Sequence, residues 1–286
     1  MYRILNKKVL NQQVKQFIVD APAVAKKAKA GQFVVLRVTE DGERIPLTVA
    51  DYDRERGSVT IIFQEVGAST IELGELEEGD CIHDFAGPLG KASEFDGMKK
   101  VCVIGGGLGC AIALPQARAL KELGARVDII AGFRSKDLII LADEMRAASD
   151  DIVICTDDGS NGRKGLVTNE LEAFLAEGRK YDAVIAIGPL VMMKFVCLTT
   201  KKYGIHTIVS MNPIMVDGTG MCGCCRLTVG GETKFACVDG PDFDGELVDF
   251  DESIRRSKMY AEFEKKAKEK HVCRLSKEIE GATENA

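Results

Sequence analysis

The sequence predicts a small antiparallel β-barrel, then a doubly wound parallel α/β domain, then a cysteine-rich segment and a C-terminal helix. Short β-branched runs fill the first ninety residues, and apolar strands alternate with helix-periodic segments from Lys99 onward. Three cysteines then fall within positions 222–225. The expected boundaries divide the chain into residues 1–97, 98–211, 212–250 and 251–286.

The composition is that of a globular protein and argues against two classes of partner. The 286 residues suit two domains and an appendage, with 45% hydrophobic and 29% charged residues. The net charge of −6 comes without a basic stripe, so nucleic acid is not expected. No apolar run reaches the roughly 18 residues that a membrane helix needs. The first twenty residues also lack a signal-peptide core. We therefore expect a cytoplasmic protein without a membrane segment.

The N-terminal region has the pattern of a small barrel. The runs "YRILNKKVL", "QFVVLRVT", "SVTIIFQEV" and "DCIHDFAG" are short and rich in β-branched residues, and turns such as "EDGE" and "DRERG" separate them. Short strands at this spacing are typical of an antiparallel barrel. "STIELGEL" is expected to form a short helix.

From Lys99 the pattern changes to alternating strands and helices. Five apolar strands begin with "KKVCVIGGGLG" and end with "HTIVSM", and helix-periodic segments such as "AIALPQARALKELG" connect them. This alternation predicts parallel strands joined by right-handed crossovers. The sheet is expected to end near Met211.

A glycine-rich loop follows the first of these strands and opens a helix. Glycine lets the backbone approach a pyrophosphate, whose charge favours a helix N-terminus. A tight strand–helix turn would also require glycine, and Cys110 breaks the strict G-x-G-x-x-G pattern. Arg134, beyond the second strand, is a candidate for contact with a phosphate. The loop glycines are Gly105, Gly106, Gly107 and Gly109.

Polar and glycine residues also follow the third and fourth strands of this region. Ligands of open parallel sheets bind outside the carboxyl ends of the strands. Several such loops on one edge therefore favour a ligand, although turn formation alone could explain each residue. The residues concerned are Asp157, Asp158, Gly159, Gly188 and Pro189.

The clustered cysteines have the spacing of an iron–sulfur site. Plant-type [2Fe–2S] sites use C-x4-C-x2-C and a distant fourth cysteine. Here Cys222 and Cys225 supply the close pair, Cys237 the distant ligand, and Asp217 stands at the first position. Zinc, an all-cysteine set that includes Cys224, and a plain Asp-Gly turn at Asp217 remain alternatives. Four isolated cysteines are instead expected in the core: Cys81, Cys102, Cys155 and Cys197.

The segment "DESIRRSKMYAEFEKKAKEK" predicts a C-terminal helix capped by Asp251 or Ser253. This helix is expected either to pack on its own domain or to dock on a partner subunit. The last ten residues are expected to be disordered.

Together these parts resemble the ferredoxin–NADP reductase superfamily. "RIPLTVADYD", "TDDGSNGRKG", "SMNPIMVDGTGMCG" and "FACVDGP" carry a closer resemblance, which covers residues 1 to about 250. They are similar to the small subunits of NADH-dependent reduced ferredoxin:NADP oxidoreductases and sulfide dehydrogenases, and to dihydroorotate dehydrogenase electron-transfer subunits. In the first of these groups an aspartate is a cluster ligand, which implies that role for Asp217.

The resemblance also implies an FAD site on the barrel. The family motif is R-x-Y-S/T. In "RIPLT" Thr48 occupies the Ser/Thr position, but Ile45 stands at the arginine position and Arg44 is displaced by one. In "FQEVGAST", Gly67, Ser69 and Thr70 are expected to face the pyrophosphate. The implied FAD residues are Arg44, Ile45, Pro46, Leu47, Thr48, Phe63, Gln64, Glu65, Val66, Gly67, Ser69 and Thr70.

The implied function is electron relay between NAD(H), FAD and a [2Fe–2S] cluster, with no catalytic side chain. The implied partner is a larger iron–sulfur flavoprotein that forms a heterodimer with this chain and handles NADP(H) and ferredoxin by electron bifurcation. The alternatives are an electron-transfer subunit of an NAD-dependent dihydroorotate dehydrogenase or a sulfide dehydrogenase, and a non-enzymatic, nucleotide-sensing zinc protein. Asp217 in place of a cysteine argues against the dihydroorotate dehydrogenase.

Overall fold

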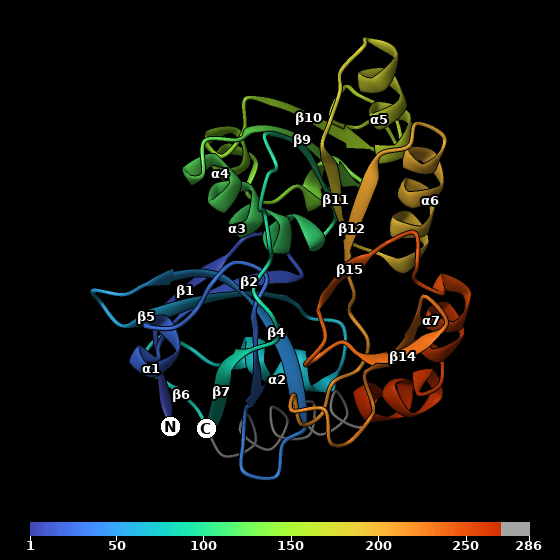
Figure 1. Ribbon diagram of the computed structural model, residues 1–286. Coiled ribbons are helices and arrows are strands. Elements are labelled where there is room, and N and C mark those ends of the chain that lie inside the picture. Colours follow the sequence, from blue (N-terminus) through green and yellow to red (C-terminus); the bar gives the residue numbers. More distant parts are fainter. Residues whose placement is uncertain (270–286) are drawn as a thin grey trace.

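The computed structural model describes residues 1–269, and its N-terminal part is an antiparallel sheet curved into a half-barrel (Figure 1). The strand order is β6-β1-β2-β5-β4-β3-β7. The strands are β1 (Tyr2–Val9), β2 (Val14–Asp20), β3 (Phe33–Arg37), β4 (Arg44–Asp53), β5 (Ser58–Gln64), β6 (Cys81–Ile82) and β7 (Asp84–Leu89). Two helices accompany them, α1 (Pro22–Ala25) and α2 (Ala68–Glu75).

Alternate residues of these strands fill the barrel. Val59, Ile61 and Phe63 recur at every second position of β5 and are fully buried. Phe63 meets Phe17 of β2 edge-to-face, with ring centroids 5.1 Å apart. The period of two in the sequence therefore marks the inner face of the barrel.

The second sheet has five parallel strands with helices on both faces, which confirms the predicted fold class. A core on one face includes α3 and α4, and a core on the other includes α5 and α6. The strands are β8 (Lys100–Gly106), β9 (Arg126–Phe133), β10 (Asp151–Thr156), β11 (Ala183–Ile187) and β12 (His206–Ser210). The helices are α3 (Gly109–Glu122), η1 (Lys136–Leu138), α4 (Ala142–Ala147), α5 (Val167–Ala176) and α6 (Leu190–Lys201).

The sequence suggested that the second sheet ends near Met211, and this prediction is wrong. After the cysteine segment the chain returns as β15 (Asp242–Asp244), which pairs antiparallel with β12. Three residues are too few to give a strand signal in the sequence. A hairpin of β13 (Arg226–Val229) and β14 (Glu232–Phe235) lies between the cysteines and β15.

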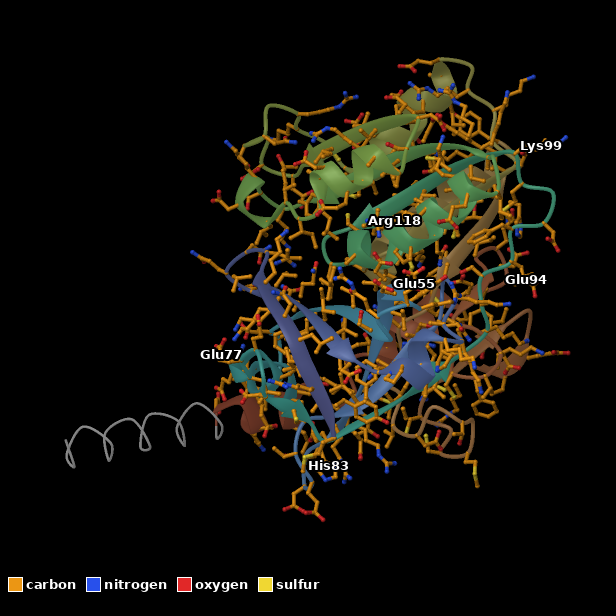
Figure 2. The ribbon with its side chains drawn as sticks, turned by 90° about the vertical axis from the view of Figure 1, so that its left-hand side faces the viewer. Glu55, Glu77, His83, Glu94, Lys99 and Arg118 are labelled. Atoms are coloured by element: carbon orange, nitrogen blue, oxygen red, sulfur yellow. The ribbon has the colours of Figure 1, made fainter. Side chains whose placement is uncertain are left out.

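The two sheets share a packed boundary. Ile62 and Ala50, on the outer face of the barrel, join the core that contains Leu114 of α3. Arg118 of α3 donates to Asp51 of β4 at 2.7 Å. Figure 2 shows Arg118 at this boundary, and the linker with Glu94 and Lys99 running along one side. The α/β domain that contains the second sheet, which we call the nucleotide-type domain, is thus held against the barrel through α3.

The C-terminal helix differs from the expectation in two respects. α7 (Phe250–Arg256) is capped by Asp249, whose carboxylate accepts the N–H of Glu252 at 2.8 Å, rather than by Asp251 or Ser253. A turn then separates α7 from a second helical stretch over residues 261–269. The rest of the predicted tail, including the last ten residues, lies outside the described residues.

Three of the four isolated cysteines are buried, as predicted. Cys102, Cys155 and Cys197 lie in the cores of the second sheet. Cys81 is instead exposed, because β6 is a two-residue strand at the edge of the barrel. Within the described part of the chain, no helix is long and apolar enough to cross a membrane.

Candidate functional site

The strand order of the second sheet changes direction at β8. The chain passes from β8 outward to β9 and β10, and then returns to β11 on the other side of β8. Ligands of open α/β sheets bind outside the carboxyl ends of the strands at such a switch point. The loops after β8 and β11 therefore flank the expected nucleotide crevice.

Three glycines of the loop after β8 are required by packing. A Cβ at Gly109 would lie 2.2 Å from the carbonyl oxygen of Ile187, and one at Gly106 would lie 2.4 Å from Sδ of Met192. A Cβ at Gly105 would meet the first turn of α3 at 2.7 Å. A tight strand–helix contact therefore explains these three residues without any ligand.

Gly107 needs a different explanation. Its φ is +56°, and a Cβ there would meet nothing within 4 Å. This open position immediately precedes α3, where N–H groups and the helix dipole favour an anion. Gly188 and Pro189 lie directly beside the loop, since a Cβ at Gly188 would approach Cα of Gly106 to 3.1 Å. The structure thus brings the two predicted glycine loops side by side, with the backbone at Gly107 open to a ligand.

The other predicted nucleotide residues lie farther along the same edge. Arg134 is exposed after β9, and Asp157 and Asp158 follow β10. Asp158 accepts the N–H and the hydroxyl of Ser160 at 2.9 and 2.7 Å, and these bonds lower the pKa of its carboxyl. Asp158 thus stabilises a turn. This turn follows β10, which is next to the strand that precedes Arg134 and two strands away from β8 at the switch point.

The first predicted flavin segment lies on β4, and its residues point to alternate faces. By register with β3, Ile45 and Leu47 pair with fully buried residues and pack against the barrel core. Arg44, Pro46 and Thr48 face the outer side of the sheet. Either face of this segment therefore presents at most three of the five residues to a ligand.

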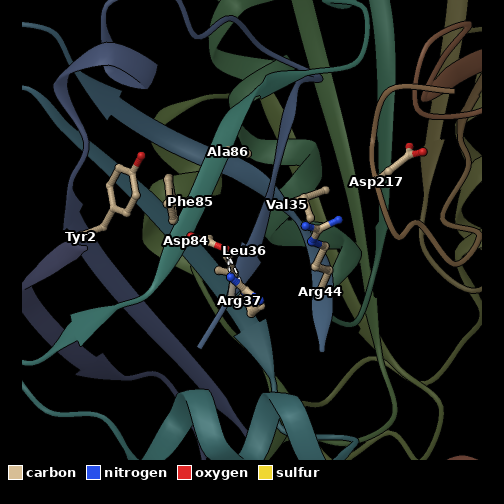
Figure 3. A pocket seen from close by; sticks show the side chains of 9 residues that line it. All are labelled: Tyr2, Val35, Leu36, Arg37, Arg44, Asp84, Phe85, Ala86 and Asp217. Atoms are coloured by element: carbon tan, nitrogen blue, oxygen red, sulfur yellow. Dashed lines mark hydrogen bonds and ion pairs between the residues drawn. The ribbon is translucent and has the colours of Figure 1, made fainter. Parts of the chain in front are cut away.

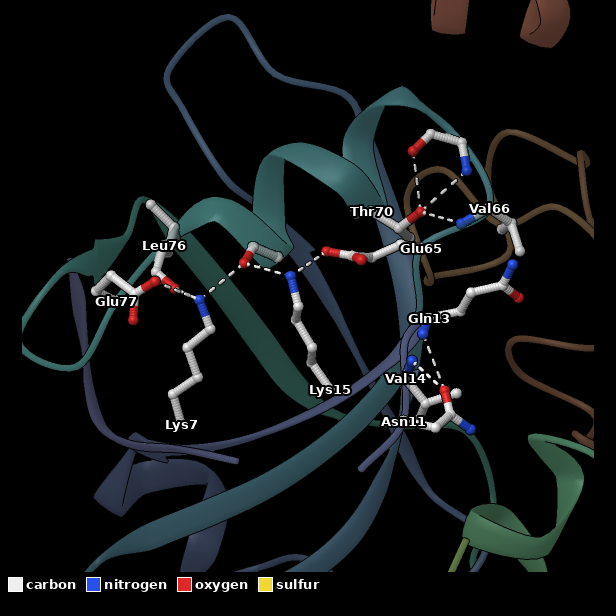
Figure 4. Close-up of polar contacts among 12 residues, drawn as sticks. Lys7, Asn11, Gln13, Val14, Lys15, Glu65, Val66, Thr70, Leu76 and Glu77 are labelled. Carbon is white, nitrogen blue, oxygen red and sulfur yellow. Dashed lines mark hydrogen bonds and ion pairs between the residues drawn. The ribbon is translucent and has the colours of Figure 1, made fainter. Parts of the chain in front are cut away.

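The second predicted flavin segment forms the end of β5 and the start of α2 (Figure 4). Thr70 Oγ1 accepts the N–H groups of Val66 and Gly67 at 3.0 and 3.1 Å. Ser69 donates to Glu43 at 3.0 Å. Since the first N–H groups of a helix have no intrahelical acceptor, those of α2 can bind an anion. The Thr70 hydroxyl shapes the loop that presents them.

Two lysines hold the opposite end of α2 (Figure 4). Lys7 Nζ donates to the carbonyl oxygens of Gly74 and Leu76 at 2.9 and 2.8 Å. Lys15 Nζ donates to Gly74 at 2.9 Å and forms an ion pair with Glu65 at 2.5 Å. Cations at the C-terminal carbonyls complement the helix dipole. Glu65 therefore helps to hold the C-terminal end of α2 through its ion pair with Lys15. These contacts do not cover the N-terminus of the helix.

Two members of this segment have side chains that are already engaged. Phe63 is fully buried in the barrel core, so only its backbone borders the loop. Gln64 donates to Gln13 at 3.0 Å. The sequence could not show that Phe63 and Gln64 differ in role from Gly67 and Thr70, because all four belong to one uninterrupted motif.

Asp217 organises the cysteine loop. Its Oδ1 accepts the N–H of Thr219 at 2.7 Å and its Oδ2 accepts the N–H of Cys222 at 2.8 Å. The bond from Thr219, ahead of the one from Cys222, lowers the pKa of the Asp217 carboxyl. The loop curls tightly because three of its glycines have φ between +69° and +86°: Gly218, Gly220 and Gly223.

The four predicted ligands lie in two pairs. Asp217 contacts Cys222 on the exposed side of the loop, and the N–H of Cys237 donates to Sγ of Cys225 at 3.5 Å in the interior. Burial raises the pKa of the Cys237 thiol to about 12. A hydrogen bond from the N–H of Cys224 lowers the pKa of the Cys222 thiol, which favours the thiolate, the form in which cysteine binds metals.

This donor set fits a two-iron cluster better than zinc. Among residues 1–269, no three His, Cys, Asp or Glu side chains gather closely enough to hold one metal ion. Zinc needs four ligands around a single centre. In a [2Fe–2S] cluster each iron takes two protein ligands, and the contacts of Asp217 with Cys222 and of Cys225 with Cys237 are compatible with that division.

A cavity of about 280 Å³ joins the cysteine loop to the barrel (Figure 3). Arg44 and Asp217 both line it, together with the Arg37–Asp84 pair, in which Arg37 Nε donates at 2.8 Å. The loop packs closely here, since a Cβ at Gly218 would lie 2.6 Å from Leu89. The sequence did not indicate Arg37 or Asp84, because alternating polar residues on a strand are typical of any solvent-facing side.

Comparison with known proteins places these features in a family. Residues 212–249 match the model of the iron–sulfur cluster binding domain of dihydroorotate dehydrogenase B. The chain is 48% identical over 262 residues to a Thermotoga maritima protein described as a homolog of the dihydroorotate dehydrogenase B (NAD(+)) electron transfer subunit, and 92% of each chain is covered. A Streptococcus mutans electron transfer subunit of that enzyme is 31% identical over 257 residues, covering 86% of this chain and 96% of the relative.

A solved structure gives the same result for the whole chain. A structure of an NADH-dependent reduced ferredoxin-NADP oxidoreductase, described as giving insights into flavin-based electron bifurcation, superposes with a TM-score of 0.90 at 46% identity. The match covers 95% of this chain and 98% of the other. The resemblance predicted from the sequence is therefore confirmed. The chain belongs to the family of iron–sulfur flavoprotein oxidoreductase subunits that comprises the dihydroorotate dehydrogenase B electron-transfer subunits and their homologues.

Proposed function

We propose that this chain is the electron-transfer subunit of an NADH-dependent ferredoxin:NADP oxidoreductase. It would exchange electrons with NAD(H) and relay them to or from a larger iron–sulfur flavoprotein in a heterodimer. The partner would handle NADP(H) and ferredoxin by electron bifurcation. The observation that supports the proposal is a loop that packs against the barrel and in which Asp217 contacts Cys222 and Cys225 contacts Cys237.

Each part of the chain has a proposed role in this relay. Bound FAD and a [2Fe–2S] cluster supply the change from two-electron to one-electron transfer. Gly107 and the N-terminus of α3 would bind the pyrophosphate of NAD(H), with Pro189 on the opposite side of the crevice. The N-terminus of α2 would bind the pyrophosphate of FAD. The outer face of β4, with Thr48, would orient the flavin beside the cysteine loop.

The ligand set supports this activity over that of a dihydroorotate dehydrogenase. Identity is 46% to the ferredoxin-NADP oxidoreductase structure and 31% to the Streptococcus mutans subunit. Asp217 also occupies the position of the first cysteine in the plant-type pattern. The second candidate function is favoured by the match of residues 212–249 to the cluster domain of dihydroorotate dehydrogenase B and by the relatives described as electron transfer subunits of that enzyme or their homologs.

Spectroscopy of the purified chain tests the cofactor assignment. We expect flavin and [2Fe–2S] absorption in the visible region, two irons per chain, and faster flavin reduction by NADH than by NADPH in stopped flow. A colourless, zinc-containing protein would contradict the assignment. Faster reduction by NADPH would instead implicate Arg134 in binding a 2′-phosphate.

Co-purification from the native cell tests the partner. We expect a larger flavoprotein that reduces NADP with NADH and reduced ferredoxin together. A partner that oxidises dihydroorotate would establish the second candidate. We also place the complex in the cytoplasm, because no disulfide joins the nine cysteines among residues 1–269, as is usual in a reducing compartment.

A further inference from the structure

Asp242 is a carboxyl group enclosed where the barrel, the nucleotide-type domain and the cysteine segment meet. It lies on β15, five residues after Cys237. Ser93, in the linker from the barrel, donates to its Oδ2 at 2.5 Å. Gln116 of α3 donates to the same oxygen at 3.2 Å. One carboxyl oxygen therefore receives hydrogen bonds from two other parts of the chain.

Two acceptor atoms at this junction have no donor. Oδ1 of Asp242 and Oε1 of Gln116 are both buried without a hydrogen-bond partner among the described residues. They belong to the same two groups that already share the bond from Nε2 to Oδ2. An unsatisfied buried acceptor costs about 1–3 kcal/mol. A proton carried by Oδ1 would make this atom a donor, and Oε1 is the unpartnered acceptor on the amide that already contacts Oδ2.

Among the described residues, the groups that act on the ionisation of Asp242 are neutral. The groups that act on it are the hydroxyls of Ser93 and Ser210 and the amide of Gln116, and no charged side chain of the described residues contributes. Burial raises the pKa of the carboxyl, and these three donors oppose that effect only in part. The surroundings are therefore those of a neutral acid.

We propose that Asp242 is a protonated carboxylic acid at neutral pH and forms a two-hydrogen-bond, acid–amide pair with Gln116. Oδ1–H donates to Oε1, and Nε2–H donates to Oδ2. The pair joins α3, which begins at the nucleotide loop, to the strand that follows the cluster ligand Cys237. Asp242 and Gln116 are thus positioning residues that fix the cysteine segment on the nucleotide-type domain. This inference holds whichever nucleotide and partner the protein uses.

The substitution Asp242→Asn separates a neutral acid from a carboxylate. An asparagine amide can complete the same pair by donating Nδ2–H to Gln116, so it replaces a neutral acid but not an anion. An acid whose folded pKa is raised loses stability as pH rises from the unfolded value, about 3.9, to the folded one. The advantage of Asp242→Asn should therefore grow by about tenfold in the unfolding equilibrium constant for each pH unit in that window.

The first experiment is infrared spectroscopy of the cofactor-loaded protein in D2O at neutral pH. We expect a protonated-carboxyl C=O band in the wild type that Asp242→Asn removes. The matched control is Asp244→Asn on the same strand, where the Asp244 side chain is 35% exposed, and it should leave the band in place. If Asp242→Asn removes only carboxylate bands, the proposal is wrong.

The second experiment is denaturant unfolding of the same proteins between pH 5 and pH 8, followed by circular dichroism and cluster absorbance. We expect Asp242→Asn to be at least as stable as the wild type, with an advantage that grows with pH. Asp242→Ala, which leaves the Gln116 amide unpaired, should raise the unfolding constant by about tenfold. Equal destabilisation by Asn and Ala at every pH would overturn the proposal.

Discussion

The backbone N–H of Cys222 donates to the carboxylate of Asp217, five positions earlier in the chain, at 2.8 Å. The same carboxylate accepts the N–H of Thr219, so Asp217 folds the loop as well as standing at the first ligand position. Each carboxylate oxygen has a second lone pair. The turn and the proposed ligand role are therefore compatible in one residue.

The α2 loop leads to a prediction about flavin retention. Thr70 Oγ1 holds the N–H groups of Val66 and Gly67, and Thr48 faces outward from β4. The double variant Thr48→Ala/Thr70→Ala should bind FAD roughly fivefold more weakly, since a lost cap costs about 1 kcal/mol. Its iron content should stay unchanged. Thr168→Ala in α5 is the control, and an FAD dissociation constant in the double variant equal to that of the control would contradict the assignment.

Two glycines allow a matched test of the nucleotide crevice. Gly107 and Gly124 both have positive φ, +56° and +83°, and a Cβ at either would meet nothing within 4 Å. Alanine should therefore cost similar backbone strain at both, about 1–2 kcal/mol. Only Gly107→Ala should raise the KM for NADH in steady-state assays. An equal rise in Gly124→Ala would mean that strain, and not the crevice, is responsible.

A partly buried ion-pair network at the other edge of the sheet should contribute to stability. Arg179 Nη1 donates to Asp128 and Asp151 at 3.0 and 2.7 Å, and its guanidinium stacks on Phe174 at 3.6 Å. Asp128 is 1% exposed. Arg179→Ala removes one of the two cations beside that carboxylate, since Arg126 Nε lies 3.4 Å from Asp128 Oδ1, and should cost about 1–3 kcal/mol.

Urea denaturation followed by circular dichroism measures this loss. Arg146→Ala removes an exposed pair with Asp143 and serves as the control, with an expected change below about 0.5 kcal/mol. A loss in Arg179→Ala no larger than in the control would show that the network adds nothing to stability.

Adjacent cysteines in the loop should behave differently. Cys225 is buried beside Cys237, whereas Cys224 is partly exposed and its backbone carbonyl accepts from Arg256 at 3.4 Å. Cys225→Ser should perturb or remove the cluster, and Cys224→Ser should leave its EPR signal and potential unchanged. Iron analysis and EPR of the two purified variants check this, and loss of the cluster in Cys224→Ser alone would refute it.

The sequence predicted the fold class because hydrophobic period and glycine position act locally. The spacing from Asp217 to Cys237 likewise identified the cluster segment, since the proposed ligands are close in sequence and their spacing is visible without the fold. Tertiary pairing left no such signal. The partition of Arg44 to Thr48 between two faces depends on register with β3, and the junction at Asp242 brings together residues up to 149 positions apart. Neither periodicity nor local propensity encodes such contacts.

The central claim is that Asp217, Cys222, Cys225 and Cys237 bind one [2Fe–2S] cluster. The most direct test is an EPR-monitored redox titration of Asp217→Cys beside the wild type. Cysteine at this position restores the plant-type spacing, so the variant should keep two irons per chain. Exchange of a carboxylate oxygen for a softer thiolate sulfur should change the g-values and shift the midpoint potential. An unchanged EPR signal and potential in Asp217→Cys would contradict the claim and leave Asp217 as a turn residue only.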